Sequence, residues 1–179
     1  MFQSFEATTS PETGGPRLAR LREVLTDRAL DGFIIPRADA HQGEYVAEAD
    51  MRLAWLTGFT GSAGFCVALQ DRAAVFIDGR YRLAVREQVD LDHFTPVDWP
   101  KTKLGDWLVA NASKGSVIGF DPWLHTKGEI DAAKARLEGS GITLRPCDNL
   151  VDVIWQDRPA PPKDLMVPYD LALSGETSA

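Results

Sequence analysis

The chain has 179 residues, which suits one domain with short flanking segments, because single domains cluster near roughly 100–150 residues. Its formal net charge is -7 and it contains no basic run, so nucleic-acid binding and attraction to an anionic membrane surface are both disfavoured. The two cysteines, Cys66 and Cys147, form no CxxC pair. They predict buried apolar thiols in a reducing compartment rather than a zinc site or a disulfide framework.

The N-terminal segment MFQSFEATTSPETGGPR has no basic stretch followed by an apolar one, so it does not resemble a secretory signal. No apolar run approaches the ~20 residues that a membrane-spanning helix needs. These two observations predict a cytoplasmic protein. Residues 1–16 are rich in Ser, Thr, Gly and Pro, which indicates a mobile N-terminal tail.

From Arg17 onward, apolar side chains recur at helical spacing, at Leu18, Leu21, Val24 and Leu25. This spacing predicts a helix that ends near Asp31-Gly32, where glycine suits a C-terminal cap. GFIIP (32–36) is typical of a buried strand, and the polar segment 38–52 is expected to wind over the surface. LAWLTGF (53–59) is compatible with either a short helix or an irregular segment.

The middle of the chain predicts a β-hairpin followed by helices. GSAGFCVALQ (61–70) and AAVFIDG (73–79) are two apolar runs on either side of a short turn. Residues 81–89 are amphipathic, with Leu83, Ala84 and Val85 near one side, and Asp78 is a plausible N-cap before them. Residues 101–113 predict a helix with four inward-facing side chains, Leu104, Trp107, Leu108 and Ala112.

In the last third, strand-like 116–121 and 142–146 alternate with helical 127–141 and with 149–159, which starts as a short helix. Together with the hairpin, this alternation predicts an α/β fold with a mixed β-sheet flanked by helices. The cluster Pro159-Ala160-Pro161-Pro162 cannot continue a helix. We therefore place one domain at 17–158, and interpret 159–179 as a proline-rich linker and the start of a further domain.

No complete catalytic centre is evident in the sequence. His41, His93 and His125 lie far apart and no HExxH motif occurs, so we expect no metal ligands in this chain. Ser62 lacks the GxSxG frame of a nucleophile elbow, and we expect no catalytic residue. The glycine-rich segment 58–64 is not followed by the Lys-Ser/Thr pair of a phosphate-binding loop, so a tight turn is the better interpretation.

The tetrapeptide Asp78-Gly79-Arg80-Tyr81 directly follows the strand-like run AAVFI. It thus lies at the C-terminal end of a strand, where α/β folds tend to place binding groups. Arg80 there offers a planar five-donor fork for a carboxylate or a peptide carbonyl. Spacing alone favours a structural role instead, in which Arg80 pairs with Asp78 or Glu44 and ties the strand end to the next helix.

Three segments in order carry a family resemblance: IIPRADAHQGEYVAEADMRLAWLTGFTGSAG, AAVFIDGRYRLAVREQV and NLVDVIWQDRP. From Leu18 to Pro162 the chain resembles the N-terminal domain of Xaa-Pro aminopeptidases, more narrowly their long three-domain cytosolic form. The resemblance implies a creatinase-type N-terminal domain in a homodimeric enzyme. A related second domain and a metal-binding catalytic domain would lie beyond Ala179. That catalytic domain holds two divalent metals, usually manganese, and hydrolyses the bond between a first residue and a penultimate proline.

The same resemblance implies a role for the DGRY segment. It implies that Arg80 reaches the active-site cleft and binds the peptide substrate, and that Asp78 and Tyr81 support it. This implication outweighs the purely structural interpretation of Arg80. The expected partners are a peptide with a penultimate proline and the catalytic domain of the same polypeptide, while this chain alone is expected not to be catalytic.

Two other functions are compatible with the same architecture. Proteins of this architecture without catalytic metals serve as peptide- or protein-binding modules, and an acidic domain would suit a basic partner. A prolidase or creatinase relative would act on a different substrate. The closing segment NLVDVIWQDRP favours the aminopeptidase branch.

Overall fold

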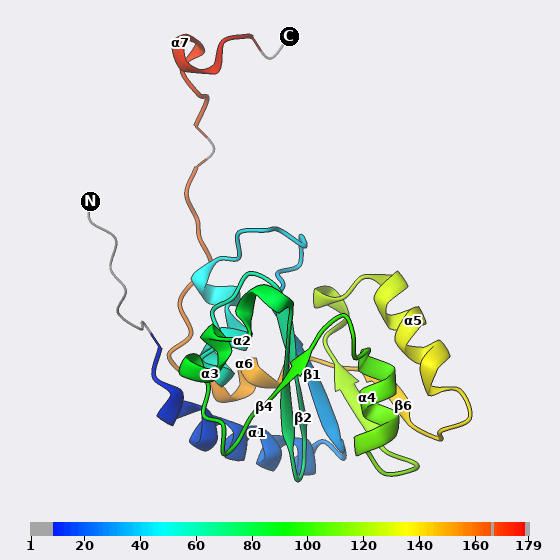
Figure 1. Ribbon diagram of the computed structural model, residues 1–179. Helices are drawn as coiled ribbons and strands as arrows, with labels where there is room; N and C mark the ends of the chain where they lie inside the picture. The colour runs from blue at the N-terminus through cyan, green and yellow to red at the C-terminus, as the bar shows by residue number, and fades with distance from the viewer. Residues whose placement is uncertain (1–8, 166, 178–179) are drawn as a thin grey trace.

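The computed structural model describes residues 9–165 and 167–177, and Figure 1 shows a six-stranded sheet with helices on both of its faces. The strand order is β4-β3-β2-β1-β5-β6. The strands are β1 Gly32–Pro36, β2 Gly64–Leu69, β3 Ala73–Ile77, β4 Thr95–Asp98, β5 Val117–Phe120 and β6 Thr143–Pro146. This arrangement confirms the predicted α/β class with a mixed sheet.

Only β2 runs against its neighbours. It pairs antiparallel with β1, with Ile34 opposite Val67, and with β3, with Cys66 opposite Val75. The β1–β5, β5–β6 and β3–β4 pairs are parallel. The C-terminal ends of five strands and the beginning of β2 therefore share one edge of the sheet, which we call the carboxyl edge.

The α-helices are α1 Gly14–Asp27, α2 Arg52–Thr57, α3 Ala84–Gln88, α4 Leu104–Asn111, α5 Lys127–Leu137, α6 Leu150–Ile154 and α7 Leu171–Ser174. Short 3-10 helices span Pro11–Thr13, Glu48–Asp50, Gly79–Tyr81 and Pro122–Leu124. In Figure 1 α1, α2, α3 and α6 lie to one side of the sheet, and α4 and α5 to the other.

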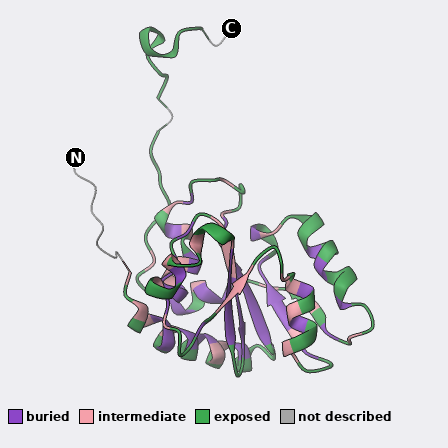
Figure 2. Ribbon diagram, viewed as in Figure 1, coloured by how far each residue is buried: buried purple, intermediate pink, exposed green. Residues whose placement is uncertain are grey.

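Alternate residues of the strands belong to two separate hydrophobic cores, because successive side chains of a strand point to opposite faces of the sheet. Phe33 and Ile35 pack with α1, α2 and α6, whereas Ile34 between them packs with α4 and α5. The central strands are accordingly buried on both faces (Figure 2). The inward-facing side chains predicted on the helix over 101–113 join the second core, with Leu108 fully buried.

The first helix begins three residues before Arg17, where the sequence placed its start. Gly14 and Gly15 are buried, and a Cβ on Gly15 would lie 2.4 Å from Cδ2 of His93. These two glycines let the helix start approach the chain just before β4. Residues 1–8 of the expected tail lie outside the described residues. Pro11–Thr13 and the residues from Gly14 onward are helical. The mobile tail over 1–16 and the domain limits 17–158 and 159–179 stay predictions.

The same helix ends at Asp27, so the prediction of a glycine cap near Asp31-Gly32 is wrong. Ala29 takes the left-handed conformation at φ 50°. The Leu30 N–H donates to the Leu25 carbonyl at 2.9 Å, and the Ala29 N–H to the Thr26 carbonyl at 3.1 Å. This is a Schellman motif with alanine in the position that glycine usually takes. Burial of Leu25 and Leu30 in one core holds it.

The predicted hairpin is confirmed as β2 and β3, and the ambiguous segment 53–59 is largely helical. The amphipathic helix predicted over 81–89 shortens to α3, and Leu83 is 84% exposed while Val85 is fully buried. A 3-10 turn at Gly79–Tyr81 occupies the start of the predicted segment, and α3 begins only at Ala84. Strand β4 was not predicted.

A cluster of ion pairs joins the start of α2 to the C-terminal end of the domain. The buried Arg52 donates to Asp152 in a bidentate pair at 2.7 and 3.0 Å and to Asp50 at 2.9 Å. Arg158 donates to Asp152 at 2.7 Å and to the Ala49 carbonyl at 2.6 Å. We call these residues the Arg52 clasp; it connects α2, α6 and the point where the chain leaves the domain.

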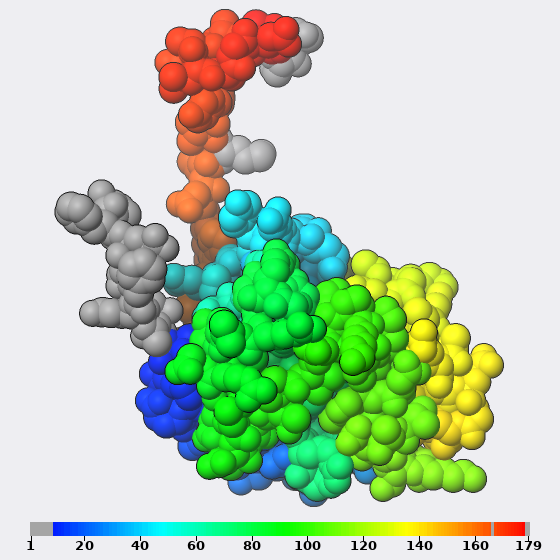
Figure 3. Space-filling model, viewed as in Figure 1, coloured from blue at the N-terminus to red at the C-terminus, as the bar shows by residue number. Residues whose placement is uncertain are grey.

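Beyond the clasp, the described residues from Pro159 onward are exposed, and the segment runs away from the domain body (Figure 3). α7 lies in this segment and has no buried residue. Among the described helices, none combines the length and the apolar character needed to cross a membrane.

Candidate functional site

The DGRY segment lies where β3 ends at the carboxyl edge. Asp78 keeps an extended backbone, and its side chain accepts a hydrogen bond from the Arg80 N–H at 2.9 Å. A short acidic side chain in this position satisfies a free amide at the start of a helical turn. The N-cap prediction is confirmed, although Asp78 caps the 3-10 turn at Gly79–Tyr81 rather than a longer helix.

The Arg80 side chain folds back onto the same carboxylate. Its Nε lies 3.1 and 3.0 Å from the two Asp78 oxygens, and its Nη2 lies 2.6 Å from Oδ2. The side chain is nevertheless 66% exposed, and Nη1 makes no hydrogen bond with a described residue. Hydrogen bonding from Arg80 lowers the pKa of Asp78. The guanidinium is thus held in place with donors still facing solvent.

Tyr81 connects this turn to the glycine-rich loop before β2. The Arg80 guanidinium carbon lies 5.2 Å from the Tyr81 ring centroid. The Tyr81 hydroxyl accepts from the Ser62 N–H at 3.0 Å and lies 2.6 Å from Ser62 Oγ, and these bonds lower the pKa of Tyr81. Its ring meets Phe59 edge-on at 5.4 Å.

Gly61 makes that packing possible. A Cβ there would lie 2.2 Å from Cζ of Phe59 and 2.9 Å from Cδ1 of Tyr81. Any residue with a side chain at this position would therefore have to displace one of the two rings. Gly58 adopts φ 86° at the end of α2. Glycines in the 58–64 segment therefore serve a turn and a close contact, as the sequence predicted.

The structure brings together Asp78, Arg80 and Tyr81. A separate exposed pair, which the sequence did not predict, lies next to this turn: Arg82 donates to Asp98 at 2.9 and 3.1 Å and does not bond to Asp78 or Arg80. Asp98 ends β4, a short strand whose two apolar residues gave no strand signal. Glu44, the alternative partner of Arg80, forms no ion pair with a described residue, although its charge helps to raise the pKa of Arg80; its carbonyl accepts from Arg37 at 2.8 Å.

The remaining candidates do not form a site. His41 lies in the loop after β1, His93 contacts Gly15, and His125 follows the turn after β5. Across residues 9–165 and 167–177, no group of three or more His, Cys, Asp or Glu residues is arranged to hold a metal ion. Cys66 is buried, and burial raises the pKa of its thiol, whereas Cys147 is half-buried.

Known proteins resemble this chain over most of its length. Relatives named "Probable Xaa-Pro aminopeptidase P" include one from Coccidioides posadasii, 35% identical over 97% of this chain and 27% of its own length. One from Arthroderma otae is 35% identical over 89% of this chain and 26% of its own. The chain thus spans about a quarter of the length of these curated relatives.

Solved structures of related proteins also resemble this chain. An X-prolyl aminopeptidase from Caenorhabditis elegans, described as a cytosolic enzyme with a di-nuclear active site, has a TM-score of 0.83 and 32% identity, covering 92% of this chain and 29% of its own. The N-terminal domain of the cytoplasmic peptidase PepQ from Mycobacterium tuberculosis has a TM-score of 0.60 at 24% identity, over 78% of this chain and 98% of its own, which shows the fold alone.

The sequence of this chain also matches the family described as "Creatinase/Prolidase N-terminal domain", over residues 17–154. That span holds the whole sheet and both hydrophobic cores except Trp155. The chain belongs to the creatinase/prolidase N-terminal domain family.

Proposed function

We propose that this chain is the N-terminal, non-catalytic domain of a metal-dependent Xaa-Pro aminopeptidase and that it shapes the substrate cleft. The parent enzyme hydrolyses the bond between a first residue and a penultimate proline. The names of the matched relatives support this proposal, as does the greater length of those relatives. In the proposed setting the parent is cytoplasmic and homodimeric.

The exposed Arg80 at the carboxyl edge is the observation that carries the proposal. Its Nε and Nη2 are occupied by Asp78, so the guanidinium plane is fixed before any ligand arrives. Nη1 can then donate to a backbone carbonyl of a peptide. Holding a substrate in register in this way assists the reaction without bond-making or bond-breaking by the domain.

The proposal assigns the metals to another part of the parent. Two divalent ions, manganese in our proposal, would supply an activated water for attack on the peptide bond. The described part of this chain offers no matching cluster of ligands, so no step through a metal is assigned to its residues. Their contribution is to bind and orient the peptide.

The test is the steady-state kinetics of the full-length parent carrying Arg80→Ala, with an Xaa-Pro peptide as substrate. We expect kcat/KM to fall tenfold or more, because the fixed donor is lost. A tenfold fall corresponds to a loss of transition-state stabilisation on the order of 1.4 kcal/mol. Arg80→Lys should recover only part of this loss, because an ammonium lacks the planar fork.

Arg82→Ala is the matched control, because Arg82 is also exposed and ion-paired two residues away. Its kcat/KM should stay within about threefold of the wild type. Equal losses for the two variants would contradict the role of Arg80. Failure of the wild-type parent to cleave any Xaa-Pro peptide would instead favour a peptide- or protein-binding module without catalytic metals.

A further inference from the structure

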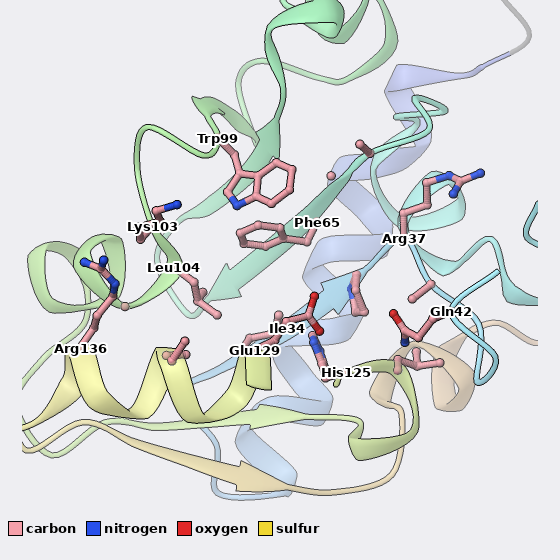
Figure 4. A pocket seen from close by; sticks show the side chains of 18 residues that line it. Ile34, Arg37, Gln42, Phe65, Trp99, Lys103, Leu104, His125, Glu129 and Arg136 are labelled. Carbon is pink, nitrogen blue, oxygen red and sulfur yellow. The ribbon is translucent and has the colours of Figure 1, made fainter. Parts of the chain in front are cut away.

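A hollow of about 440 Å³ opens at the carboxyl edge on the side of α4 and α5. It lies between the ends of β1 and β2 and the two helices, and its walls come from segments far apart in the sequence (Figure 4). Its volume falls in the range of about 300–1,000 Å³ typical of small-molecule sites. The Arg80 side chain does not line it.

One wall of the hollow is a fixed aromatic surface. Phe65 stacks on Phe76 with ring centroids 4.3 Å apart, and Trp99 meets Phe65 edge-on at 6.3 Å. The backbone N–H of Trp99 donates to the Ile77 carbonyl at 2.8 Å, which anchors the tryptophan to the end of β3. Phe65 is half-buried and Trp99 is 37% exposed. Both rings therefore retain apolar surface for a ligand.

Positive charge surrounds this apolar wall, although the whole chain carries a net charge of -7. Arg37, Lys103 and Arg136 line the hollow, against a single carboxylate from Glu129. Figure 4 shows Lys103 and Arg136 at one end and Arg37 at the other. The Glu129 carboxylate already accepts a hydrogen bond from the Thr126 N–H at 2.9 Å.

The two cations at the α4–α5 end differ in how they are held. Arg136 donates to Asp106 at 2.8 and 2.9 Å. Its side chain also packs closely against Gly105, because a Cβ added to Gly105 would lie 2.6 Å from the Cβ of Arg136. Lys103 makes no ion pair with a described residue. At this end of the hollow, Lys103 is therefore the cation whose charge no described carboxylate balances.

One residue that lines the hollow has a buried polar atom without a partner. This residue is His125, whose Nε2 is buried with no hydrogen bond among the described residues. Burial lowers the pKa of His125, against the opposing effects of Glu129 and Asp121, which favours the neutral imidazole. Buried polar groups in proteins normally have a partner.

From these observations we propose that the hollow binds an apolar carboxylate. An aromatic or branched aliphatic body would lie against Phe65 and Trp99, and the carboxylate would meet Lys103 and Arg136. A polar group beside the body would bond to His125. Such a ligand is either the C-terminal residue of a peptide or a free aryl acid, and the site is independent of the role proposed for Arg80.

The test is an NMR titration of the 179-residue chain with N-acetylphenylalanine, its neutral amide, and phenylacetate. We expect saturable shifts at the Trp99 indole N–H and the His125 ring, with a Kd on the order of 1 mM. The amide should bind about fivefold or more weakly, because it carries no charge for Lys103. Tighter binding of N-acetylphenylalanine than of phenylacetate identifies a peptide terminus, and the reverse order identifies a free acid.

Lys103→Gln should weaken binding of the acid by about fivefold and leave binding of the amide unchanged. Lys101→Gln is the matched control, because Lys101 is exposed two residues away but does not line the hollow. Retained signal dispersion checks that each variant is folded. Equal affinity for acid and amide, the same effect from both lysine variants, or no saturable shift at Trp99 and His125 overturns the proposal.

Discussion

Asp78 accepts hydrogen bonds from both the backbone and the side chain of Arg80. One carboxylate therefore starts the turn after β3 and fixes the direction of the guanidinium. Because both bonds come from one residue, the position of Arg80 depends on local geometry more than on distant packing. Because these hydrogen bonds are local in sequence, the residue type of Asp78 and its position after a strand were enough to predict the cap.

A first prediction at the residue scale concerns the ionisation of Asp78. Arg80 lowers the pKa of this carboxyl below its usual value of 3.8, so the stabilisation it provides is present above that value. The stabilisation is lost as the pH falls through the lower pKa of the folded state. In Arg80→Ala the pKa of Asp78 should rise toward 3.8, measured by NMR titration of the carboxyl carbon.

Arg82→Ala serves as the control for this titration, because it removes a nearby cation that does not bond to Asp78. The pKa of Asp78 should change much less in that variant. An equal rise in both variants would mean that general positive charge, and not the direct pair with Arg80, lowers the pKa of Asp78.

At the scale of elements, burial explains why the central strands could be predicted. β1, β2, β3 and β5 appear as apolar runs because both faces of the central sheet are covered. The two edge strands are four residues long, contain a proline and are less buried. β6 was predicted because Ile142, Thr143 and Leu144 keep the alternation of a strand, whereas TPVD in β4 has one aliphatic residue and was missed.

Only part of the candidate site could be predicted from the sequence. The Asp78 cap was predictable from its position directly after a strand. The bond between Tyr81 and Ser62 depends on how two loops meet in space, which no local pattern records. The hollow beside Phe65 and Trp99 could not be predicted either, because its lining residues come together only when the sheet forms.

A second prediction, at the element scale, concerns the end of α1. Ala29 holds a left-handed conformation that costs an L-residue about 1–2 kcal/mol. Ala29→Gly should therefore stabilise the fold by about 0.5–1 kcal/mol, after the extra chain entropy of glycine is deducted. The free energy of unfolding in urea provides the measurement.

The same substitution in an ordinary helical position provides the comparison. Ala135 is exposed within α5, so Ala135→Gly should destabilise the chain by about 1 kcal/mol. Destabilisation by both glycine substitutions would show that the left-handed position at residue 29 carries no strain.

At the scale of the whole molecule, the Arg52 clasp connects segments 100 residues apart in the sequence. Arg52 is 5% exposed, and its two carboxylate partners are about 30% exposed or less. Trp55 stacks on Trp155 at 5.2 Å between α2 and the end of α6. The clasp thus fixes where the chain leaves the domain.

Arg52→Ala should accordingly destabilise the domain by about 3 kcal/mol, because it leaves partly buried carboxylates with fewer donors. Chemical denaturation of the chain measures this loss. Arg72→Ala removes an exposed pair with Asp71 and should cost much less, because solvent screens exposed pairs. A small loss for Arg52→Ala, similar to that for Arg72→Ala, would mean that solvent replaces the buried pairs.

The clasp also determines how a mechanical load would enter the domain. Tension applied to the segment beyond Pro159 would reach Arg158 first and pass through Asp152 to α6, and through Ala49 to the turn before α2. Because Arg52 links the same Asp152 to α2, α2 and α6 would share this load before it reached β6, the strand that precedes α6 in the chain.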